Sequence, residues 1–494
     1  MVLQGGRQVI QLSHKNLMRE ACYIDGAWVG ANSGATLSVD NPATGATIGR
    51  VPKMGEAETL RAIDAANAAL PAWRAKTGKE RAGLLRKWFD LIMAHQDDIA
   101  RIMTTEQGKP LAEAKGEVAY AASFIEWFAE EGKRVYGDVI PTFAAGRRII
   151  VTKEPVGVVA AITPWNFPAA MLTRKAGPAL AAGCTLVCKP ASQTPFTALA
   201  LVVLAEEAGI PKGVINIVTG SAREIGGAIT ASPIVRKLTF TGSTEVGKVL
   251  IEQCAATVKK VSMELGGNAP FLVFDDADLD AAVEGAIASK YRNNGQTCVC
   301  ANRFYVQRGV AKAFADKLAA RVAQMKVGDG LEAGVVLGPL IDDAAADKVD
   351  ELMADATSKG AEVVIGGGRH ELGGRFYKPT ILLGATQDMR LSREEIFGPV
   401  APIFVFDDEK EAVGYANDTE FGLASYFYTR DVGRVFRVME ALEYGIVGIN
   451  EGIISTEVAP FGGVKESGMG REGSKYGIED YLEVKYALIG GIGA

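Results

Sequence analysis

The chain has 494 residues, of which 48% are hydrophobic and 23% are charged, as is typical of a globular protein with two or three domains. Its formal net charge of −6 gives no electrostatic basis for binding nucleic acid or an anionic membrane. No apolar run approaches the roughly 18 residues that cross a bilayer, so we expect neither nucleic acid nor membrane among the partners.

The first 19 residues carry several basic side chains and no acidic one. This pattern has some likeness to an organelle-targeting segment, but it lacks the apolar core of a secretory signal. We therefore expect residues 1–20 to form a frayed extension. The six cysteines are too few and too scattered for a disulfide framework, which fits a reducing cytoplasm.

Three amphipathic helices are predicted at 56–75, 79–98 and 110–131, where apolar residues recur with helical spacing. From about residue 148, short β-rich runs alternate with helical stretches. The expected strands are 149–151, 157–162, 185–188, 214–218 and 238–240, and the expected helices are 168–182, 194–208, 221–231 and 244–256. This alternation predicts a parallel, doubly wound α/β sheet.

The carboxyl ends of four of these strands are followed by loops rich in Gly, Lys or amide residues. These loops contain Thr163-Pro164-Trp165-Asn166-Phe167-Pro168, Lys189-Pro190, Thr219-Gly220 and Thr241-Gly242-Ser243-Thr244-Glu245-Val246-Gly247. Since ligands bind beyond the carboxyl ends of such strands, the sequence predicts a nucleotide crevice. Thr194, just before Pro195, is a candidate N-cap for the helix at 194–208.

A second α/β block is expected from about 270 to 470. Its strands are predicted near 271–274, 303–307, 378–383, 400–406 and 446–449. The last strand, Tyr481–Ile489, is expected to form a small sheet with the β-rich stretch 139–153, outside both domains. Exposed strands of this kind pair across subunits, so we expect a homodimer or a homotetramer.

Two segments point to covalent catalysis on a carbonyl group. Cys298 and Cys300 lie one residue apart after the turn Gly295-Gln296-Thr297, a setting that displays a thiol rather than packing it. Glu264, followed by Leu265-Gly266-Gly267, supplies a separate acid or base. The alternatives are a buried structural cysteine and a surface carboxylate. No histidine lies near these motifs, so neither a Cys–His dyad nor a metal site is expected.

Together these motifs resemble the aldehyde dehydrogenase superfamily, from about residue 22 to the end. The matching segments are PWNFP at 164–168, KP at 189–190, FTGS at 240–243, MELGGN at 263–268, GQTC at 295–298, EEIFGPV at 394–400, PFGG at 460–463 and KESGMGRE at 465–472. Within that superfamily, GQTCVCANR at 295–303 and EYGIVGINEGIIS at 443–455 resemble the succinate-semialdehyde dehydrogenases.

The resemblance implies a fold and a reaction. The fold is a Rossmann-like cofactor domain at 21–138 and 157–268, an α/β catalytic domain at 269–472, and a small β oligomerisation segment at 139–156 and 473–494. In the reaction, Cys298 attacks the aldehyde, and Asn166 with the backbone N–H of Cys298 stabilises the oxyanion. Glu264 then activates the water that hydrolyses the thioester. The alternative for Asn166 is a turn-forming residue beside prolines.

The resemblance also implies a nicotinamide cofactor. The further candidates for binding it are Thr163, Pro164, Trp165, Gly220, Gly242, Ser243, Gly247, Leu265, Glu395 and Phe397, the last with core packing as its alternative. Lys189 is expected at the adenosine ribose, where the family carries a glutamate after Lys-Pro and one further residue. Here that position is Ser192, so no carboxylate repels a 2′-phosphate, and NADP is expected to be preferred over NAD.

Substrate choice is expected to depend on Arg174, Arg292 and Ser455, which match the carboxylate clamp of succinate-semialdehyde dehydrogenases; two solvated surface arginines are the alternative. Glutarate semialdehyde remains open as the substrate, because a pocket separates one methylene by only ~1–3 kcal/mol. A catalytically idle homologue and a thioesterase are the alternatives of other classes. Cys300 is either a redox switch that forms a disulfide with Cys298 or a small apolar loop residue.

Overall fold

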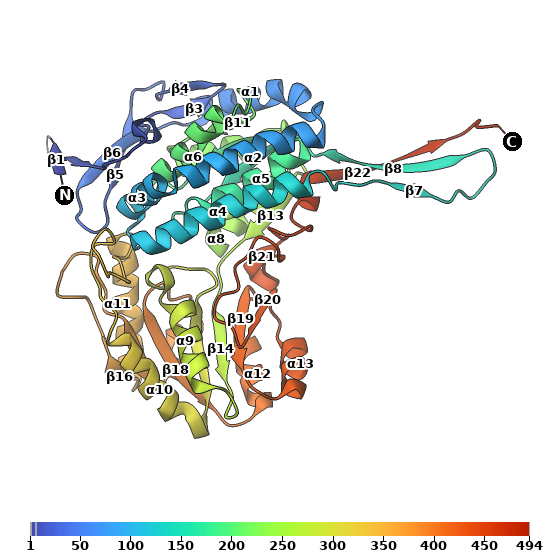
Figure 1. Ribbon diagram of the computed structural model, residues 1–494. Coiled ribbons are helices and arrows are strands. Elements are labelled where there is room, and N and C mark those ends of the chain that lie inside the picture. The colour runs from blue at the N-terminus through green and yellow to red at the C-terminus, as the bar shows by residue number, and fades with distance from the viewer. Residues whose placement is uncertain (1, 5–6, 494) are drawn as a thin grey trace.

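A six-stranded sheet, ordered β11-β10-β9-β12-β13-β21, forms the centre of the upper part of the molecule in Figure 1. The computed structural model describes residues 2–4 and 7–493. The strands are β9 (Val158–Ile162), β10 (Thr185–Lys189), β11 (Ile215–Ile217), β12 (Val235–Thr241), β13 (Lys260–Glu264) and β21 (Gly468–Met469). All but β21 run parallel, and the strand order reverses between β9 and β12. The predicted doubly wound sheet is therefore confirmed, although β13 was not foreseen.

Helices cover both faces of this sheet. They are α1 (Glu56–Arg74), α2 (Gly78–Ala94), α3 (Gln96–Gln107), α4 (Leu111–Glu131), α5 (Ala170–Ala182), α6 (Pro195–Glu207), α7 (Ala222–Ala231) and α8 (Thr244–Ala255). The single helix predicted at 79–98 is wrong, because the chain leaves helical geometry at His95 (φ −110°, ψ 21°) and α3 then continues to Gln107.

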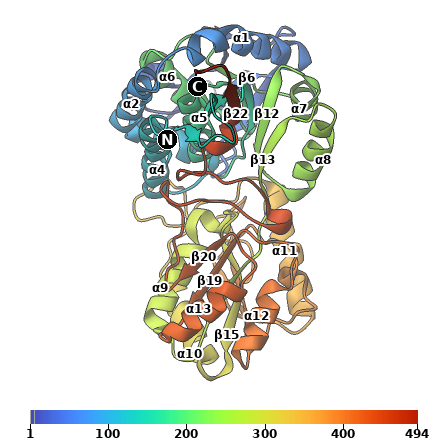
Figure 2. The same cartoon turned by 90° about the vertical axis from the view of Figure 1, so that its right-hand side faces the viewer.

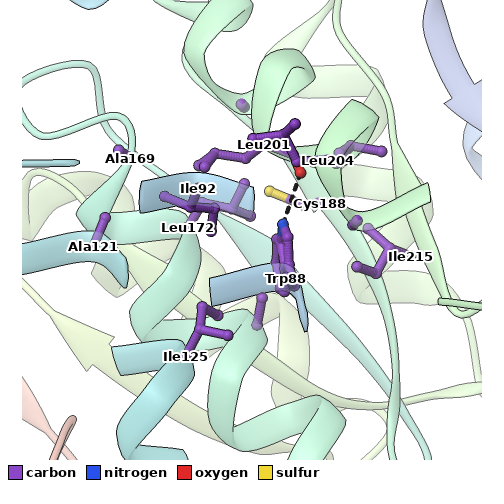
Figure 3. Packing of buried hydrophobic residues seen from close by; sticks show 14 of the residues in the cluster. Trp88, Ile92, Ala121, Ile125, Ala169, Leu172, Cys188, Leu201, Leu204 and Ile215 are labelled. Carbon is purple, nitrogen blue, oxygen red and sulfur yellow. Dashed lines mark hydrogen bonds between the residues drawn. The ribbon is translucent and has the colours of Figure 1, made fainter. Parts of the chain in front are cut away.

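The largest apolar core packs α2, α4, α5 and α6 against β10 and β11. Figure 3 shows Trp88 at its centre, with Ile125, Leu172, Cys188 and Leu201 around it. The indole N–H of Trp88 donates to the Leu201 carbonyl at 2.9 Å, so the ring is buried without an unsatisfied donor. Burying each large apolar side chain contributes roughly 1.5–3 kcal/mol, which fixes these helices over the sheet.

The N-terminus of α6 is capped by a distant carboxylate rather than by the residue expected from the sequence. Thr194 occupies the N-cap position, but its hydroxyl donates to the Trp165 carbonyl at 3.4 Å. Glu106 of α3 instead accepts hydrogen bonds from the backbone N–H groups of Phe196 and Thr197, each at 2.8 Å. Burial raises the pKa of Glu106 to about 8.

A seven-stranded sheet, ordered β16-β17-β18-β15-β14-β19-β20, forms the lower part in Figure 1. Its strands are β14 (Ala269–Val273), β15 (Ala301–Gln307), β16 (Glu362–Ile365), β17 (Thr380–Leu383), β18 (Val400–Phe406), β19 (Ala424–Tyr428) and β20 (Ile446–Ile449). Its helices are α9 (Leu279–Lys290), α10 (Arg308–Val322), α11 (Asp343–Ser358), α12 (Glu409–Asn417) and α13 (Val432–Ala441). The sequence did not predict β16 or β19.

A third, three-stranded sheet extends away from the body in Figure 1 and points toward the viewer in Figure 2. It contains β7 (Asp138–Ile140), β8 (Arg148–Pro155) and β22 (Leu482–Ile489), in the order β22-β8-β7. This confirms the expected sheet between the chain end and the stretch around 139–153. Its apolar side chains include Val139, Val484 and Tyr486, which are 76%, 68% and 70% exposed.

The N-terminal segment is more ordered than predicted. Two short hairpins, β3 (Cys22–Ile24) with β4 (Ala27–Val29) and β5 (Thr36–Asp40) with β6 (Thr47–Pro52), follow the pair β1 (Val2–Gln4) and β2 (Arg7–Val9). The expected frayed extension is wrong for residues 8–20. Gln8 accepts from the Asn41 amide at 2.9 Å, His14 N–H donates to Asp98 at 2.7 Å, and Leu17 is fully buried. Residues 1, 5 and 6 lie outside the described part. Over residues 2–4 and 7–493, no helix is long and apolar enough to cross a membrane.

Candidate active site

A cavity of about 390 Å³ lies at the point where the strand order of the six-stranded sheet reverses, between the loops of the two large sheets. Its walls come from residues 164–167 after β9, 241–243 after β12, 265–266 after β13, Cys298, 341–345, Lys348 and 395–397. The structure thus brings together five of the predicted motifs, which are far apart in the sequence. Lys189 is the last residue of the neighbouring strand β10, Ser192 follows that strand, and Gly220 follows β11.

The loop that carries Cys298 has an unusual backbone. Three successive residues, Asn293, Asn294 and Gly295, have left-handed φ angles of 52°, 56° and 75°. Such conformations cost of order 1–3 kcal/mol at a non-glycine residue and persist only where the surroundings enforce them. At Gly295 a side chain is also excluded, because a Cβ atom would lie 2.2 Å from the Gly398 carbonyl.

Hydrogen bonds to distant segments enforce this loop conformation. Asn294 donates from its amide to the Gly338 carbonyl at 2.8 Å, and the Gln296 side chain accepts from the Ile341 N–H at 2.9 Å. The backbone N–H of Asn293 donates to Glu113 of α4 at 2.8 Å. The loop that carries Cys298 is therefore fixed by contacts within the chain itself.

Cys298 is the partly exposed cysteine of the pair at 298 and 300, and it lines the cavity. Burial raises the pKa of Cys298 to about 12; Arg174 and Arg292 oppose this rise, and Glu395 and Glu264 add to it. Because the thiolate is the reactive form of a cysteine, a thiol in this environment becomes reactive only with a base or a nearby positive charge.

Cys300 is buried, and its thiol donates weakly to the carbonyls of Lys290 at 3.4 Å and Ala301 at 3.6 Å. Burial raises the pKa of Cys300 as well. Its redox-switch role with Cys298 stays a prediction.

Asn166 lies directly beside the loop that carries Cys298. Its side-chain N–H donates to the Gln296 carbonyl at 3.0 Å, and its own backbone carbonyl accepts from Lys109 Nζ at 2.7 Å and from Asn293 Nδ2 at 3.0 Å. The side-chain amide is thus held against the backbone two residues before Cys298. This geometry differs from that of a simple turn-forming residue beside prolines.

Glu264 ends β13 and is buried, so a surface carboxylate is ruled out. Its Oε2 atom has no hydrogen-bond partner within the described chain. Burial raises the pKa of Glu264 well above its usual range, and the nearby charge of Glu472 adds to this effect, while Arg174 and Lys175 oppose it. A carboxyl group in such an environment is a strong base once it has lost its proton.

Arg174 and Arg292 are not two solvated surface arginines, so that alternative is wrong. Arg174 is only 2% exposed, and its guanidinium lies 4.0 Å from the centre of the Phe461 ring and 2.8 Å from the Glu472 carboxylate. Its Nε donor is buried without an acceptor in the described chain. Arg292 is half-buried, 5.2 Å from the centre of the Phe167 ring, and borders a second cavity of about 440 Å³.

Tyr120 of α4 is a candidate site residue that the sequence interpretation missed. Its hydroxyl is buried and makes no hydrogen bond to any described residue. Burial raises the pKa of Tyr120, whereas the nearby cations Arg174 and Arg292 oppose the rise, and Ser455 also lies beside it.

A periodic pattern could have pointed to this residue. Glu113, Glu117, Tyr120 and Phe124 follow one another at spacings of four, three and four, which places them on one face of α4.

The cavity wall offers donors and acceptors suited to a dinucleotide. The Thr241 hydroxyl is buried without a partner within the described chain, and Ser243 caps α8 by accepting from the Val246 N–H at 3.4 Å. A helix N-terminus of this kind favours a pyrophosphate. Lys189 is buried, donates only to the Pro190 carbonyl at 3.3 Å, and has no carboxylate partner in the described chain; burial lowers its pKa.

Two of the predicted cofactor glycines are already required by the protein itself. A Cβ atom at Gly220 would lie 2.1 Å from the Met54 carbonyl, and one at Gly247 would lie 2.4 Å from the Leu265 side chain. Their presence is therefore explained by close packing and is not by itself a sign of a bound ligand.

Glu395 and Phe397 line the cavity together with Trp165. Glu395 accepts from the Gly267 N–H at 3.2 Å, and burial raises its pKa to about 7. Phe397 has a left-handed φ of 52°, and its ring meets the Trp165 ring edge to face at 5.6 Å. Lys348 of α11, which the sequence interpretation missed, donates to the Glu395 carbonyl at 2.7 Å and joins the wall from a distant segment.

The chain is similar to a known protein family, to curated proteins and to solved structures. Residues 28–487 match the model of the aldehyde dehydrogenase family. The chain is 68% identical over 483 residues to glutarate-semialdehyde dehydrogenase of Pseudomonas aeruginosa, covering 98% of this chain and 100% of that protein. It is 67% identical over 481 residues to succinate-semialdehyde dehydrogenase [NADP(+)] GabD of Escherichia coli, covering 97% and 100%. The crystal structure of an E. coli NADP dependent enzyme superposes with a TM-score of 0.97 at 67% identity, covering 97% of this chain and 100% of that one.

Proposed function

The chain belongs to the aldehyde dehydrogenase family and is an oxidoreductase, and from this premise we propose that it oxidises succinate semialdehyde to succinate with NADP as its preferred cofactor. Close relatives named as dehydrogenases, and the presence of Cys298, Glu264 and Asn166, speak against the idle homologue and the thioesterase. The substrate class, the cofactor preference and the residue roles below are the content of the proposal.

The observation that carries the substrate proposal is the pair of arginines around Cys298. Arg174 lies 3.8 Å from the Met171 sulfur, and Arg292 lies 5.2 Å from the centre of the Phe167 ring. Met171 and Phe167 line the same cavity as Cys298, so both guanidinium groups border the proposed reacting centre. The planar fork of an arginine binds both oxygens of a carboxylate. An aldehyde with a terminal carboxylate would therefore be oriented with its carbonyl toward Cys298, with Ser455 and Tyr120 as further donors.

Cys298 begins the reaction as the thiolate, after its thiol proton has passed to water. Its sulfur then forms a bond to the aldehyde carbon, and the carbonyl electron pair moves onto oxygen. The side-chain N–H of Asn166 and the backbone N–H of Cys298 donate to this oxyanion, and losing one such donor typically costs ~2.7–4 kcal/mol. Thr241, Ser243, Lys189 and the 395–397 segment would hold the dinucleotide, which when bound would supply the hydride acceptor. As hydride leaves the former aldehyde carbon, the oxyanion electrons re-form the carbonyl, and a thioester on Cys298 results.

Glu264 serves the second half of the reaction, in which the thioester on Cys298 is hydrolysed. It takes a proton from water as the water oxygen attacks the thioester carbonyl, and the Cys298 thiolate leaves. Only the deprotonated carboxylate can do this, and its pKa is raised, so the step should accelerate as the pH rises.

NADP preference is supported by Ser192 and by the surroundings of Lys189. A carboxylate about 4 Å from a 2′-phosphate would cost about 1 kcal/mol in water and more in a drier site. Ser192 carries no charge, and Lys189 has no acidic partner within the described chain. A relative at 67% identity is named as an NADP(+) enzyme, which fits the same preference.

Glutarate semialdehyde is the second candidate substrate. The relative from P. aeruginosa at 68% identity is named for it, and one methylene is worth only ~1–3 kcal/mol in a pocket. Both candidates share the terminal carboxylate that the two arginines would bind.

A steady-state assay of NADPH formation tests the proposal, using succinate semialdehyde, glutarate semialdehyde and uncharged butyraldehyde. We expect kcat/KM to be at least about tenfold higher for a carboxylated aldehyde, the gain typical of a charge-assisted pair. Equal values for succinate semialdehyde and butyraldehyde would contradict the substrate class. The same assay with NAD in place of NADP tests the cofactor preference.

We further propose that the three-stranded sheet pairs with a second copy, giving a homodimer or homotetramer, and that the enzyme works in the cytoplasm. The exposed apolar side chains of β22 support the pairing, and six cysteines that are all free fit the compartment. The proposed domains are those expected from the sequence, since the strands of 157–268 and of 269–449 form separate sheets, and β21 alone returns to the first sheet.

A further inference from the structure

A buried ion pair beneath the nucleophile loop takes no part in the chemistry proposed above. Lys109, just before α4, pairs directly with Glu117 of α4, and each side chain is only 1% exposed. Taking two charges out of water is costly unless further hydrogen bonds satisfy them. The hydrogen bonds that Lys109 and Glu117 make to other residues therefore indicate the role of the ion pair.

Each member of the pair holds the backbone of the segment that contains Asn166. Lys109 Nζ donates to the Asn166 carbonyl at 2.7 Å and lies 3.9 Å from the centre of the Phe167 ring. Glu117 accepts from the backbone N–H groups of Ala169 at 3.0 Å and Ala170 at 3.3 Å, at the start of α5. The ion pair thus holds both ends of the segment 166–170 through hydrogen bonds.

Asn293 connects the segment 166–170 to the loop that carries Cys298. The Asn293 amide donates both to the Asn166 carbonyl, at 3.0 Å, and to the Gln296 carbonyl, at 3.1 Å. Gln107 fixes this amide by donating to Asn293 Oδ1 at 2.9 Å. The Asn166 side chain closes the network by donating to the same Gln296 carbonyl at 3.0 Å.

We propose that Lys109, charged and paired with Glu117, is a positioning residue for the oxidation. By holding the Asn166 carbonyl, it keeps the side-chain amide of Asn166 beside the Gln296–Cys298 backbone, where the oxyanion forms. Lys109 itself touches neither aldehyde nor cofactor in this assignment. The inference rests on the proposed role of Asn166 and extends it by naming the residues that set the donor's position.

The decisive variant is the double substitution Lys109→Met with Glu117→Gln. It removes both charges together, so no buried charge is left without its partner, and the glutamine oxygen still accepts from the start of α5. We expect kcat to fall about 10- to 100-fold with both succinate semialdehyde and butyraldehyde, because a misplaced donor weakens transition-state binding. KM should change by less than about threefold, since the donor acts mainly in the transition state.

A matched control lies on the same helix. Lys115 of α4 pairs with Asp97 at 2.7 Å, but these side chains are 41% and 69% exposed. Lys115→Met with Asp97→Asn should leave kcat within about twofold, as expected for a surface pair. Thermal unfolding and titration of the reactive thiol would show how much of each preparation is folded. A loss of kcat that merely follows the loss of folded enzyme would overturn the proposal.

Combining these changes with Asn166→Ala separates positioning from general damage. If Lys109 acts through Asn166, removing the ion pair from the Asn166→Ala enzyme should lower single-turnover oxidation by no more than about threefold. If the ion-pair substitution lowers the rate of the Asn166→Ala enzyme by the same factor as that of the wild type, the proposal is contradicted. Because butyraldehyde is measured as well, the outcome stands even if the enzyme shows no preference for carboxylated aldehydes, which would overturn only the proposed substrate.

Discussion

The guanidinium of Arg174 lies 2.8 Å from the carboxylate of Glu472, and both side chains are buried. Burial opposes the ionisation of Glu472, but Lys175 and Arg174 together hold its pKa below the usual range. The pairing fixes the direction of Arg174 and leaves its Nε donor without an acceptor in the described chain. It also places a negative charge near Glu264, whose pKa rises further as a result.

Arg292 should contribute to binding a carboxylated aldehyde. Arg292→Ala is expected to raise KM for succinate semialdehyde about tenfold or more, since a hydrogen bond to a charged group contributes ~1.5–3 kcal/mol. KM for butyraldehyde should change little. Arg321→Ala is the matched control, because Arg321 borders the same cavity but pairs with Glu284 at the surface. Equal increases in KM for the two aldehydes would reject the carboxylate clamp.

Ser192 should control the choice between the two nicotinamide cofactors. Ser192→Glu is expected to lower the ratio of kcat/KM for NADP to that for NAD by about fivefold to a hundredfold, through repulsion of the 2′-phosphate. Ser192→Gln has nearly the same shape without the charge and should leave the ratio almost unchanged. A similar shift in both variants would mean that size, rather than charge, decides the cofactor.

Glu264 should be needed for hydrolysis of the thioester and less for its formation. In Glu264→Gln we expect the first turnover of NADPH formation to persist in rapid-mixing experiments, while steady-state kcat falls by at least about a hundredfold, as for loss of a general base. Because the pKa of Glu264 is raised, wild-type hydrolysis should speed up as the pH rises. A variant that loses the first turnover as well would place Glu264 earlier in the reaction.

Glu106 should make the protein less stable as the pH rises. Its folded pKa of about 8 lies above the ordinary 4.5, so between these values the folded state binds the proton that the unfolded chain has released. The free energy of unfolding should fall by up to about 1.4 kcal/mol per pH unit over this window. Urea titrations at several pH values should show this slope in the wild type and a flatter one in Glu106→Gln. An unchanged slope would assign it to other groups.

The three-stranded sheet should hold subunits together. Val484→Asp with Tyr486→Asp introduces charges on side chains that are 68% and 70% exposed, and it should shift the protein toward monomers in analytical ultracentrifugation. Leu372→Asp is the control, because Leu372 is also exposed, at 57%, but lies outside this sheet. Equal sedimentation of both variants and the wild type would show that β22 is not at a subunit contact.

Local patterns were sufficient to predict most of the first sheet and its helices. Strands such as β9 and β10 are short apolar runs between helical periods, and their loops carry Gly, Pro and Lys where ligands approach. β13 and β19 were missed, because a single buried run has no alternation to distinguish it from other apolar segments. The break at His95 was also missed, since apolar spacing continues across it.

The sequence by itself determined the chemical groups: Cys298 on a glycine-bearing turn, Glu264 before a pair of glycines, and Asn166 among prolines. Only the tertiary structure decided their partners. Glu106 caps a helix about 90 residues away, Lys109 holds Asn166, and Arg174 meets a carboxylate almost 300 residues later. The packing of helices decides which residue lies close enough to pair with a buried charge. That packing depends on the whole chain rather than on the spacing of neighbouring residues.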